Sequence, residues 1–249
     1  MVMDKHTLAL IGLVGSSLDV LGALYLAYDL LGGEHGPLRT LTRAVTYGVL
    51  FGIGYGLLLG PVFGVACGIA HGYSLASEYS RASKNMPPPG IWYDLTMSAI
   101  RGGSFAIGAA YEFGPVFGIT FGLLNTAGQV VAYRLGVRPT MEYAPAARPR
   151  LSRRFLLAGL NRTVGNAVAA YVSAVVAHRM DVGLSFAIRV GLAIGLVTTI
   201  SGAFTPVIEW TADRLPERRM GVVGVTLILT GFTLQSAQYW AVLFNVELK

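Results

Sequence analysis

The stretch GVLFGIGYGLLLGPVFGVACGIAHG, residues 48–72, decides the fold, because seven glycines stand in it at four-residue intervals. Glycine in the interior of a soluble helix costs about 1 kcal/mol relative to alanine, so a row of this length needs a compensating gain. In a lipid bilayer that gain is close van der Waals contact between helices that meet along small residues. We therefore predict a membrane helix with glycine-zipper packing along Gly48, Gly52, Gly56, Gly60, Gly64, Gly68 and Gly72.

A second copy of this pattern begins 54 residues later, around the identical pentapeptide GPVFG. Residues 36–72 align on residues 90–126 without a gap. The proline in each copy lacks an N–H and opens the helical ladder, so we expect a kink at Pro61 and at Pro115. The glycines that continue the packing pattern in the second copy are Gly114, Gly118 and Gly122.

The connection between the two copies, residues 74–96, holds Glu78, Arg81, Lys84 and a proline run and cannot cross a membrane. If each copy is one kinked helix, the second copy must cross in the direction opposite to the first. The sequence therefore predicts an inverted repeat, an arrangement that several transporter families share.

The composition places the whole chain, residues 1–249, in a single membrane domain. It is 53% hydrophobic and 13% charged, with a mean hydropathy of +0.57, whereas soluble domains carry about 25% charged residues. Apolar segments of about 20 residues, the length that spans a bilayer, recur throughout. We predict an all-α polytopic protein of about six transmembrane helices, at His6–Leu31, Thr46–Tyr73, Ser98–Tyr133, Phe155–His178, Gly183–Trp210 and Met220–Val246.

The net charge of +6 comes mostly from arginines in the connections between spans. Such a charge in a membrane protein sets orientation and attracts anionic lipid headgroups, and we do not expect it to bind nucleic acid. The positive-inside rule makes residues 135–154 a basic cytoplasmic loop and leaves the N- and C-termini outside. The preference for arginine over lysine is typical of a GC-rich bacterial genome, which favours a bacterial inner membrane.

Ionisable side chains at membrane depth are costly, so each one within a predicted span is a candidate functional group. Glu112 stands where the first copy has Leu58, directly before the shared Gly-Pro kink. An acid beside unpaired backbone is typical of ion sites in broken-helix transporters. The same acids and arginines can equally neutralise one another as structural ion pairs. The polar-path candidates are Asp19, Glu112, Asn125, Gln129, Arg162 and Arg189, while Arg101 and Glu209 are expected at the membrane interface.

No catalytic constellation is recognisable, so we expect neither an enzyme nor a cofactor. The single cysteine, Cys67, excludes an internal disulfide and a cysteine-based zinc site. The four histidines all fall near the ends of predicted spans, and we expect no metal site.

Two classes of function remain. The first is a small channel or secondary transporter with a midplane polar site, assembled as a homo-oligomer or within a membrane complex. The alternative is a non-catalytic membrane scaffold or subunit whose glycine seams pack against a larger complex. A pore-forming effector is a third option, for which no residue is diagnostic.

Overall fold

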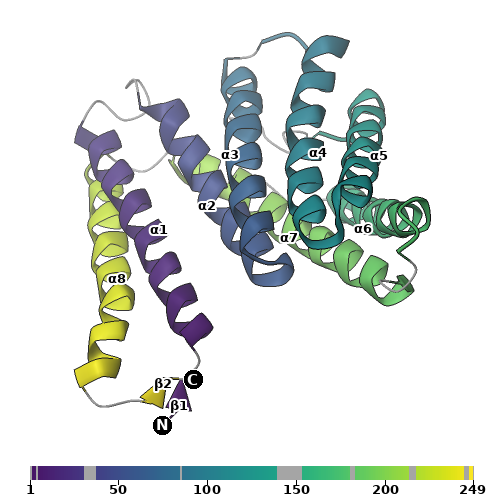
Figure 1. Ribbon diagram of the computed structural model, residues 1–249. Helices are drawn as coiled ribbons and strands as arrows, with labels where there is room; N and C mark the ends of the chain where they lie inside the picture. Colours follow the sequence, from purple (N-terminus) through teal and green to yellow (C-terminus); the bar gives the residue numbers. More distant parts are fainter. Residues whose placement is uncertain are drawn as a thin grey trace. The chain divides into compact units, whose positions relative to one another are not determined.

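The structure is a computed structural model that describes residues 2–3, 5–30, 38–84, 86–138, 153–179, 183–212, 217–243 and 247–248. The chain forms two compact units. The terminal unit comprises Met1–Val45 and Ala212–Lys249, and the hairpin unit comprises Thr46–Thr211. The helices in chain order are α1 (Lys5–Leu30), α2 (Arg39–Leu59), α3 (Pro61–Ser83), α4 (Ile91–Phe113), α5 (Pro115–Arg134), α6 (Arg153–Val176), α7 (Gly183–Ala212) and α8 (Glu217–Leu243) (Figure 1).

The architecture is almost entirely helical, as the sequence predicts, and is compatible with an integral membrane protein. The described strands are β1 (Val2–Met3) and β2 (Glu247–Leu248), which pair in parallel. In the part of the chain that the structure describes, five helical segments are long and apolar enough to cross a membrane: Thr7–Leu30, Arg39–Leu59, Pro115–Arg134, Leu184–Thr205 and Arg219–Ala237.

The glycine row of residues 48–72 is not one kinked helix, and this prediction is wrong. α2 ends at Leu59 and α3 starts at Pro61, with Gly60 between them at φ 104° and ψ 163°. Such backbone angles are adopted almost only by glycine, and proline is favoured at the first position of a helix. The Gly60 N–H donates to the Gly56 carbonyl at 3.1 Å, and the Gly60 carbonyl accepts from the Gly64 N–H at 3.0 Å. One residue therefore ends one helix and starts the next.

The row folds back on itself at Gly60, so that its two halves face each other. A Cβ atom placed on Gly48 would lie 3.3 Å from the Gly68 carbonyl oxygen and 4.0 Å from the Gly72 Cα. A Cβ on Gly64 would lie 2.7 Å from the Gly56 Cα, closer than a real side chain could sit. The glycines thus allow α2 and α3 to pack backbone against backbone, and they do not serve several neighbouring helices in turn.

The second copy forms a second hairpin in the same way. Gly114 has φ 93° and ψ 161°, donates to the Ala110 carbonyl at 3.0 Å, and separates α4 from α5. α4 and α5 then pack along small residues: a Cβ on Gly118 would lie 2.5 Å from the Ala106 carbonyl oxygen, and one on Gly122 would lie 2.8 Å from the Gly102 carbonyl oxygen.

These turns correct the predicted number and direction of the helices. The segments Thr46–Tyr73 and Ser98–Tyr133 each contain two antiparallel helices, so the described residues form eight helices where six were expected. The inverted repeat rested on one crossing per copy. Because each aligned copy contains a whole turn, α2 and α4 run in the same direction, as Figure 1 shows.

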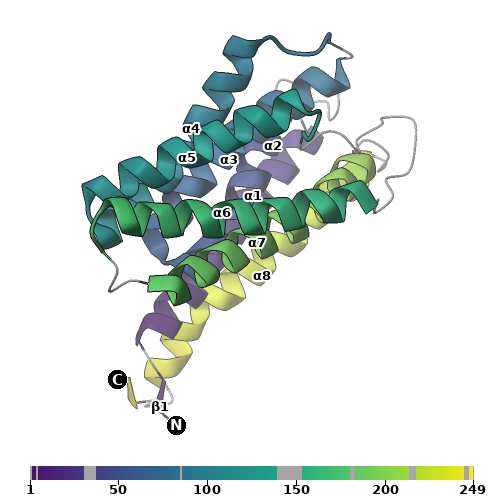
Figure 2. The ribbon, with the colours of Figure 1, turned by 90° about the vertical axis from the view of Figure 1, so that its right-hand side faces the viewer.

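Two further helix pairs also meet along small residues. In the hairpin unit α6 packs against α7, where a Cβ on Gly191 would lie 2.7 Å from the Thr163 carbonyl oxygen (Figure 2). In the terminal unit α1 packs against α8, where a Cβ on Gly15 would lie 2.7 Å from the Gly231 carbonyl oxygen. Both pairs are antiparallel.

Candidate functional site

The hairpin unit buries an ion pair between α3 and α4. Arg101 donates from Nη2 to Oε1 of Glu78 at 2.9 Å, and both side chains are only 4% exposed. Arg101 also donates from Nε to the Ser74 hydroxyl at 2.7 Å and from Nη1 to the Tyr133 hydroxyl. The Tyr133 hydroxyl in turn donates to Oε1 of Glu78 at 2.8 Å. A buried charge is tolerated when it is paired and hydrogen-bonded in this way.

A second ion pair lies nearby, at the end of the unit where α5 stops. Asp94 is fully buried and accepts from Nη2 of Arg138, at 2.8 Å to one oxygen and 2.9 Å to the other. The half-exposed Arg134 approaches the same carboxylate at 3.7 Å. Arg138 also lies over the Tyr133 ring, with its guanidinium carbon 4.9 Å from the ring centroid. Tyr133 therefore links the two ion pairs.

These pairs adjoin a cavity of about 80 Å³ among α2 to α7. Its lining extends from Arg138, whose side chain is 20% exposed, to the completely buried Tyr55. The described side chains of the lining include three arginines and no aspartate or glutamate. The polar residues of the lining are Tyr55, His71, Tyr79, Arg101, Asn125, Gln129, Arg138, Arg162, Asn166, Thr198 and Thr205.

Arg162 differs from the other two arginines of the lining. Within the part of the chain that the structure describes, no carboxylate lies within 4.0 Å of its guanidinium and no side chain or carbonyl accepts a hydrogen bond from it. Gln129, on the neighbouring α5, also forms no side-chain hydrogen bond to a described residue, and its buried Oε1 is left without a partner. Among the described residues of the lining, Arg162 and Gln129 thus have polar side-chain groups without a hydrogen-bond partner.

Aromatic rings separate the cavity from the Gly-Pro turns. The rings of Tyr55 and Phe105 meet edge to face, 5.6 Å apart, and Phe121 follows 6.0 Å from Phe105. Phe117 and Phe186, 5.9 Å apart, continue the layer toward the turns. These side chains close the cavity on that side with apolar surface.

Three of the six polar-path candidates lie together, because Asn125, Gln129 and Arg162 all line the cavity. Asp19 belongs to the terminal unit, where it accepts a hydrogen bond from Gln235 of α8. The helix α1 that carries it therefore pairs with α8 and contributes nothing to the cavity lining.

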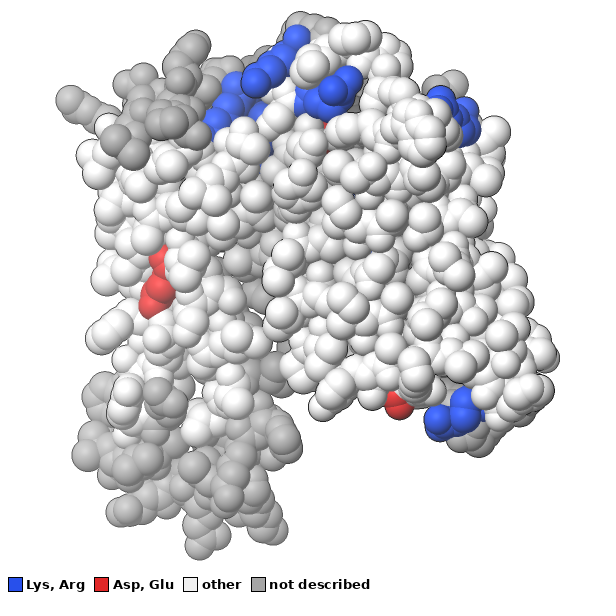
Figure 3. Space-filling view, turned by 45° about the horizontal axis from the view of Figure 1, so that its top comes forward, with Lys and Arg blue, Asp and Glu red and all other residues white. Residues whose placement is uncertain are grey.

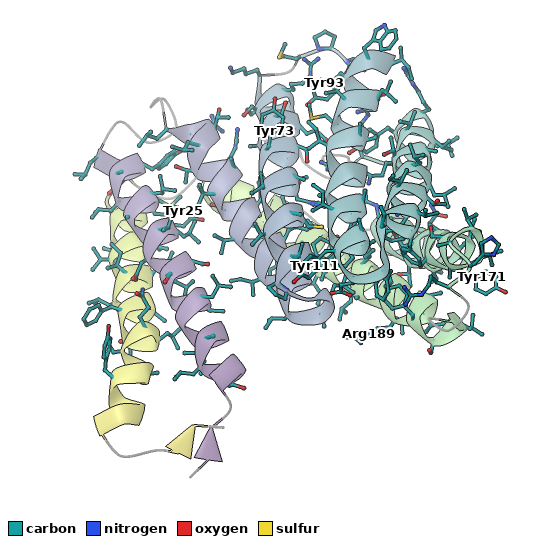
Figure 4. All side chains as sticks on the ribbon, in the orientation of Figure 1. Tyr25, Tyr73, Tyr93, Tyr111, Tyr171 and Arg189 are labelled. Carbon is teal, nitrogen blue, oxygen red and sulfur yellow. The ribbon has the colours of Figure 1, made fainter. Side chains whose placement is uncertain are left out.

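The remaining two candidates, Glu112 and Arg189, lie near the turn end of the hairpin unit and are not among the described residues that line the cavity. Glu112 is exposed two residues before the Gly114 turn, because α4 ends there and does not continue past a kink. The exposed Arg189 donates to the Leu58 carbonyl at 3.5 Å, beside the Gly60 turn. Figure 4 labels Arg189 at this turn end of the hairpin unit and Tyr93 at the opposite, basic end.

The basic end of the hairpin unit is where α3 and α5 stop and α4 begins. Arg81, Lys84, Arg134 and Arg138 are among the described basic residues near it. Figure 3 shows charged atoms at the two ends of the hairpin unit and an uncharged surface between them. Most of the predicted basic loop of residues 135–154 lies outside the described residues, as does the side chain of Glu209.

Sequence reasoning missed the ion pairs, because it assigned Glu78 and Arg138 to loops and Arg101 to the interface. A polar periodicity could have found them. His71, Ser74 and Glu78 recur at helical spacing along α3, and all three are buried. In α4 the same holds for Asp94, Ser98, Arg101 and Ser104. Residues three or four apart share one helix face, so each set marks a face turned inward.

A comparison of the chain with protein-family models, with curated proteins and with solved structures finds no match.

Proposed function

We propose that this chain is an integral membrane protein that passes a small solute, as a channel or secondary transporter, through the cavity of the hairpin unit. The observation that carries the proposal is the polar cavity itself, which three arginines line although only 13% of the residues are charged. Ionisable groups inside a membrane bundle generally mark a substrate or ion path.

The shape of the cavity supports alternating access, in which the cavity is open to one side of the membrane and closed to the other. Its lining begins at the partly exposed Arg138 and stops at the aromatic layer of Tyr55 and Phe105. A solute that enters from the basic end would reach the middle of the bundle and meet an apolar barrier. Passage then requires the rings to move, and hydrophobic constrictions are a common form of gate.

The hairpins sharpen the proposed orientation. Because each hairpin returns the chain to the side from which it started, Arg81 and Lys84 join Arg134 and Arg138 at the basic end. Among the described residues, Arg179 and Arg189 are the arginines near the turn end. The positive-inside rule then assigns the basic end to the cytoplasm. A crossing by each of the eight described helices would leave both termini on the outer side, and a bacterial plasma membrane remains the proposed location.

Flux into proteoliposomes tests the proposal. Asn125 lines the cavity and its amide donates only to the Phe121 carbonyl of its own helix, at 3.0 Å. The substitution Asn125→Phe adds bulk to the cavity without removing a bond between helices. We expect it to lower flux of the transported ion at least tenfold. Leu124→Phe is the matched control, since Leu124 is 37% exposed and does not line the cavity. Equal flux in both variants, or no flux of any common ion in the native protein, would remove the proposal.

A membrane scaffold or subunit is the second candidate, and the terminal unit favours it. α1 and α8 form a pair whose outer faces are apolar, with Leu13 at 56% and Phe232 at 67% exposed. Such faces suit either lipid or another membrane helix. Native mass spectrometry of the protein released from nanodiscs distinguishes the two, because a scaffold is expected to carry a stable partner or further copies of itself.

A further inference from the structure

We infer that the ligand of the cavity is a small monovalent anion, held by Arg162 and Gln129. This inference rests on the proposed function and adds the class of solute. It is derived from the charges around the cavity, from the two polar side chains without partners, and from the size of the space.

The charges around the cavity do not balance. Arg101, Arg138 and Arg162 line it, and two carboxylates lie behind the lining. Glu78 pairs with Arg101, and Asp94 pairs with Arg138. Among the described residues one positive charge is left, which disfavours a cation in the same space and favours an anion of single charge.

The unbalanced charge is located on Arg162. Its guanidinium faces the cavity from α6 and has neither a carboxylate nor a hydrogen-bond acceptor among the described residues. A guanidinium offers five N–H donors in a planar fork that suits oxyanions. Arg162 is only partly exposed, and withdrawing such a group from water is costly unless an acceptor replaces the water. An anion bound at Arg162 would supply that acceptor.

Gln129 completes the site from α5, a helix in contact with α6. Its side chain forms no hydrogen bond to the described protein, so the amide is available to turn its NH₂ group toward an anion. The neighbouring Asn125 and Asn166 differ in that their NH₂ groups are engaged, although the buried Oδ1 of Asn166 also has no partner among the described residues. Each of them already donates from Nδ2 to a carbonyl of its own helix, at 3.0 Å and 2.7 Å.

The volume limits the size of the ligand. A water molecule takes about 30 Å³ of liquid volume, so a cavity of about 80 Å³ accommodates two or three waters or one small anion. Halides, nitrate and formate are of this size. Nucleotides, sugars and amino acids are too large for the cavity in this conformation.

Anion binding is measured on the purified full chain in detergent, at constant ionic strength. Sodium nitrate, sodium formate and sodium chloride replace sodium gluconate, and the melting temperature is followed as a function of concentration. A ligand that binds the folded state raises the melting temperature in a saturable manner. We expect saturation with at least one small anion and none with gluconate, whose size excludes it.

Variants assign the binding to the two residues. Arg162→Gln is expected to raise the dissociation constant on the order of tenfold to a hundredfold, because a charge-assisted hydrogen bond is lost. Arg162→Lys keeps the charge and should remain within about tenfold of the native protein. Gln129→Ala is expected to weaken binding about fivefold. Arg189→Gln, at the exposed turn end, is the matched control and should bind as the native protein does.

The outcomes separate this inference from the proposed function. No saturable anion effect, or an equal effect in Arg162→Gln and Arg189→Gln, would overturn the anion site even if proteoliposomes show flux of a cation. Saturable binding that depends on Arg162 supports the site, and if flux is absent, only the transport proposal fails. Should Arg162→Gln prove unstable, binding by Gln129→Ala at native affinity would overturn the inference instead.

Discussion

The two ends of the hairpin unit hold their charged residues in opposite environments. At the basic end Glu78 and Arg101 are buried, paired and bonded to Tyr133, although each is far more costly to bury than an apolar residue. At the turn end Glu112 and Arg189 are both exposed. Arg189 forms one long hydrogen bond, to the Leu58 carbonyl at 3.5 Å. The comparison teaches that an acid just before a Gly-Pro sequence is not automatically a site. What matters is whether the helix continues past the glycine.

The largest expected difference between the two ends comes from removing a carboxylate. Glu78→Ala leaves Arg101 buried without its partner, and breaking a buried ion pair typically costs about 3–5 kcal/mol. Glu112→Ala removes an exposed side chain and should change the free energy of unfolding by no more than about 0.5 kcal/mol. Unfolding in mixed detergent micelles, followed by circular dichroism, measures both. A small effect of Glu78→Ala would contradict the buried pair.

Tyr133 provides the next largest effect. Tyr133→Phe removes the hydroxyl that accepts from Arg101 and donates to Glu78, so both charged groups lose a bond. We expect a loss of about 2 kcal/mol in the free energy of unfolding, within the usual penalty for buried groups left unsatisfied. Tyr111→Phe is the control in the same measurement, because Tyr111 is 75% exposed and should change nothing.

At the turn end the backbone, and not charge, should limit stability. Gly114→Ala forces a side chain onto φ 93° and ψ 161°, although the added Cβ meets no atom within 4 Å. Strain at such angles costs about 1–3 kcal/mol, and the lower entropy of the unfolded chain offsets part of it. We expect a net loss of about 1 kcal/mol. Gly103→Ala, inside α4 and equally free of contacts, should instead be neutral or stabilising. Equal melting temperatures for the two variants would contradict the turn.

The smallest effect is expected at Arg189. Its hydrogen bond to the Leu58 carbonyl is long and exposed, and exposed charges contribute about 0–1 kcal/mol. Arg189→Gln should therefore melt within about one or two degrees of the native protein in differential scanning fluorimetry. A large drop would mean that the turn end has a charged network of its own, and the contrast between the two ends would disappear.

The helical class and the close packing of small residues could be predicted from the sequence, because apolar length and glycine spacing are local properties. The turns at Gly60 and Gly114 could have been predicted as well. Glycine just past a helix end followed by proline at the next helix start is a known asymmetry. One helix over Ser98–Tyr133 would also be about 54 Å long, far more than the roughly 30 Å of a bilayer core.

The site was only partly predictable, since its geometry depends on which helices are neighbours. Asn125, Gln129 and Arg162 were recognised because they are polar and lie within apolar sequence. Glu78 was assigned to a loop, because the helix boundary was placed at Tyr73 while α3 continues to Ser83. Once the turn at Gly60 is known, a helix of 23 residues that starts at Pro61 brings Glu78 inside.

The one-residue turns also bear on how such a chain can change during evolution. A helical hairpin crosses the membrane twice. Adding or deleting a whole hairpin therefore leaves every downstream segment facing the same compartment. Gaining or losing a single helix would reverse the orientation of every helix that follows. The basic residues of those helices would then lie on the outer side, contrary to the positive-inside rule. A fold assembled from α2/α3, α4/α5 and α6/α7 can therefore grow or shrink by whole pairs while the orientation of the remainder is inherited unchanged.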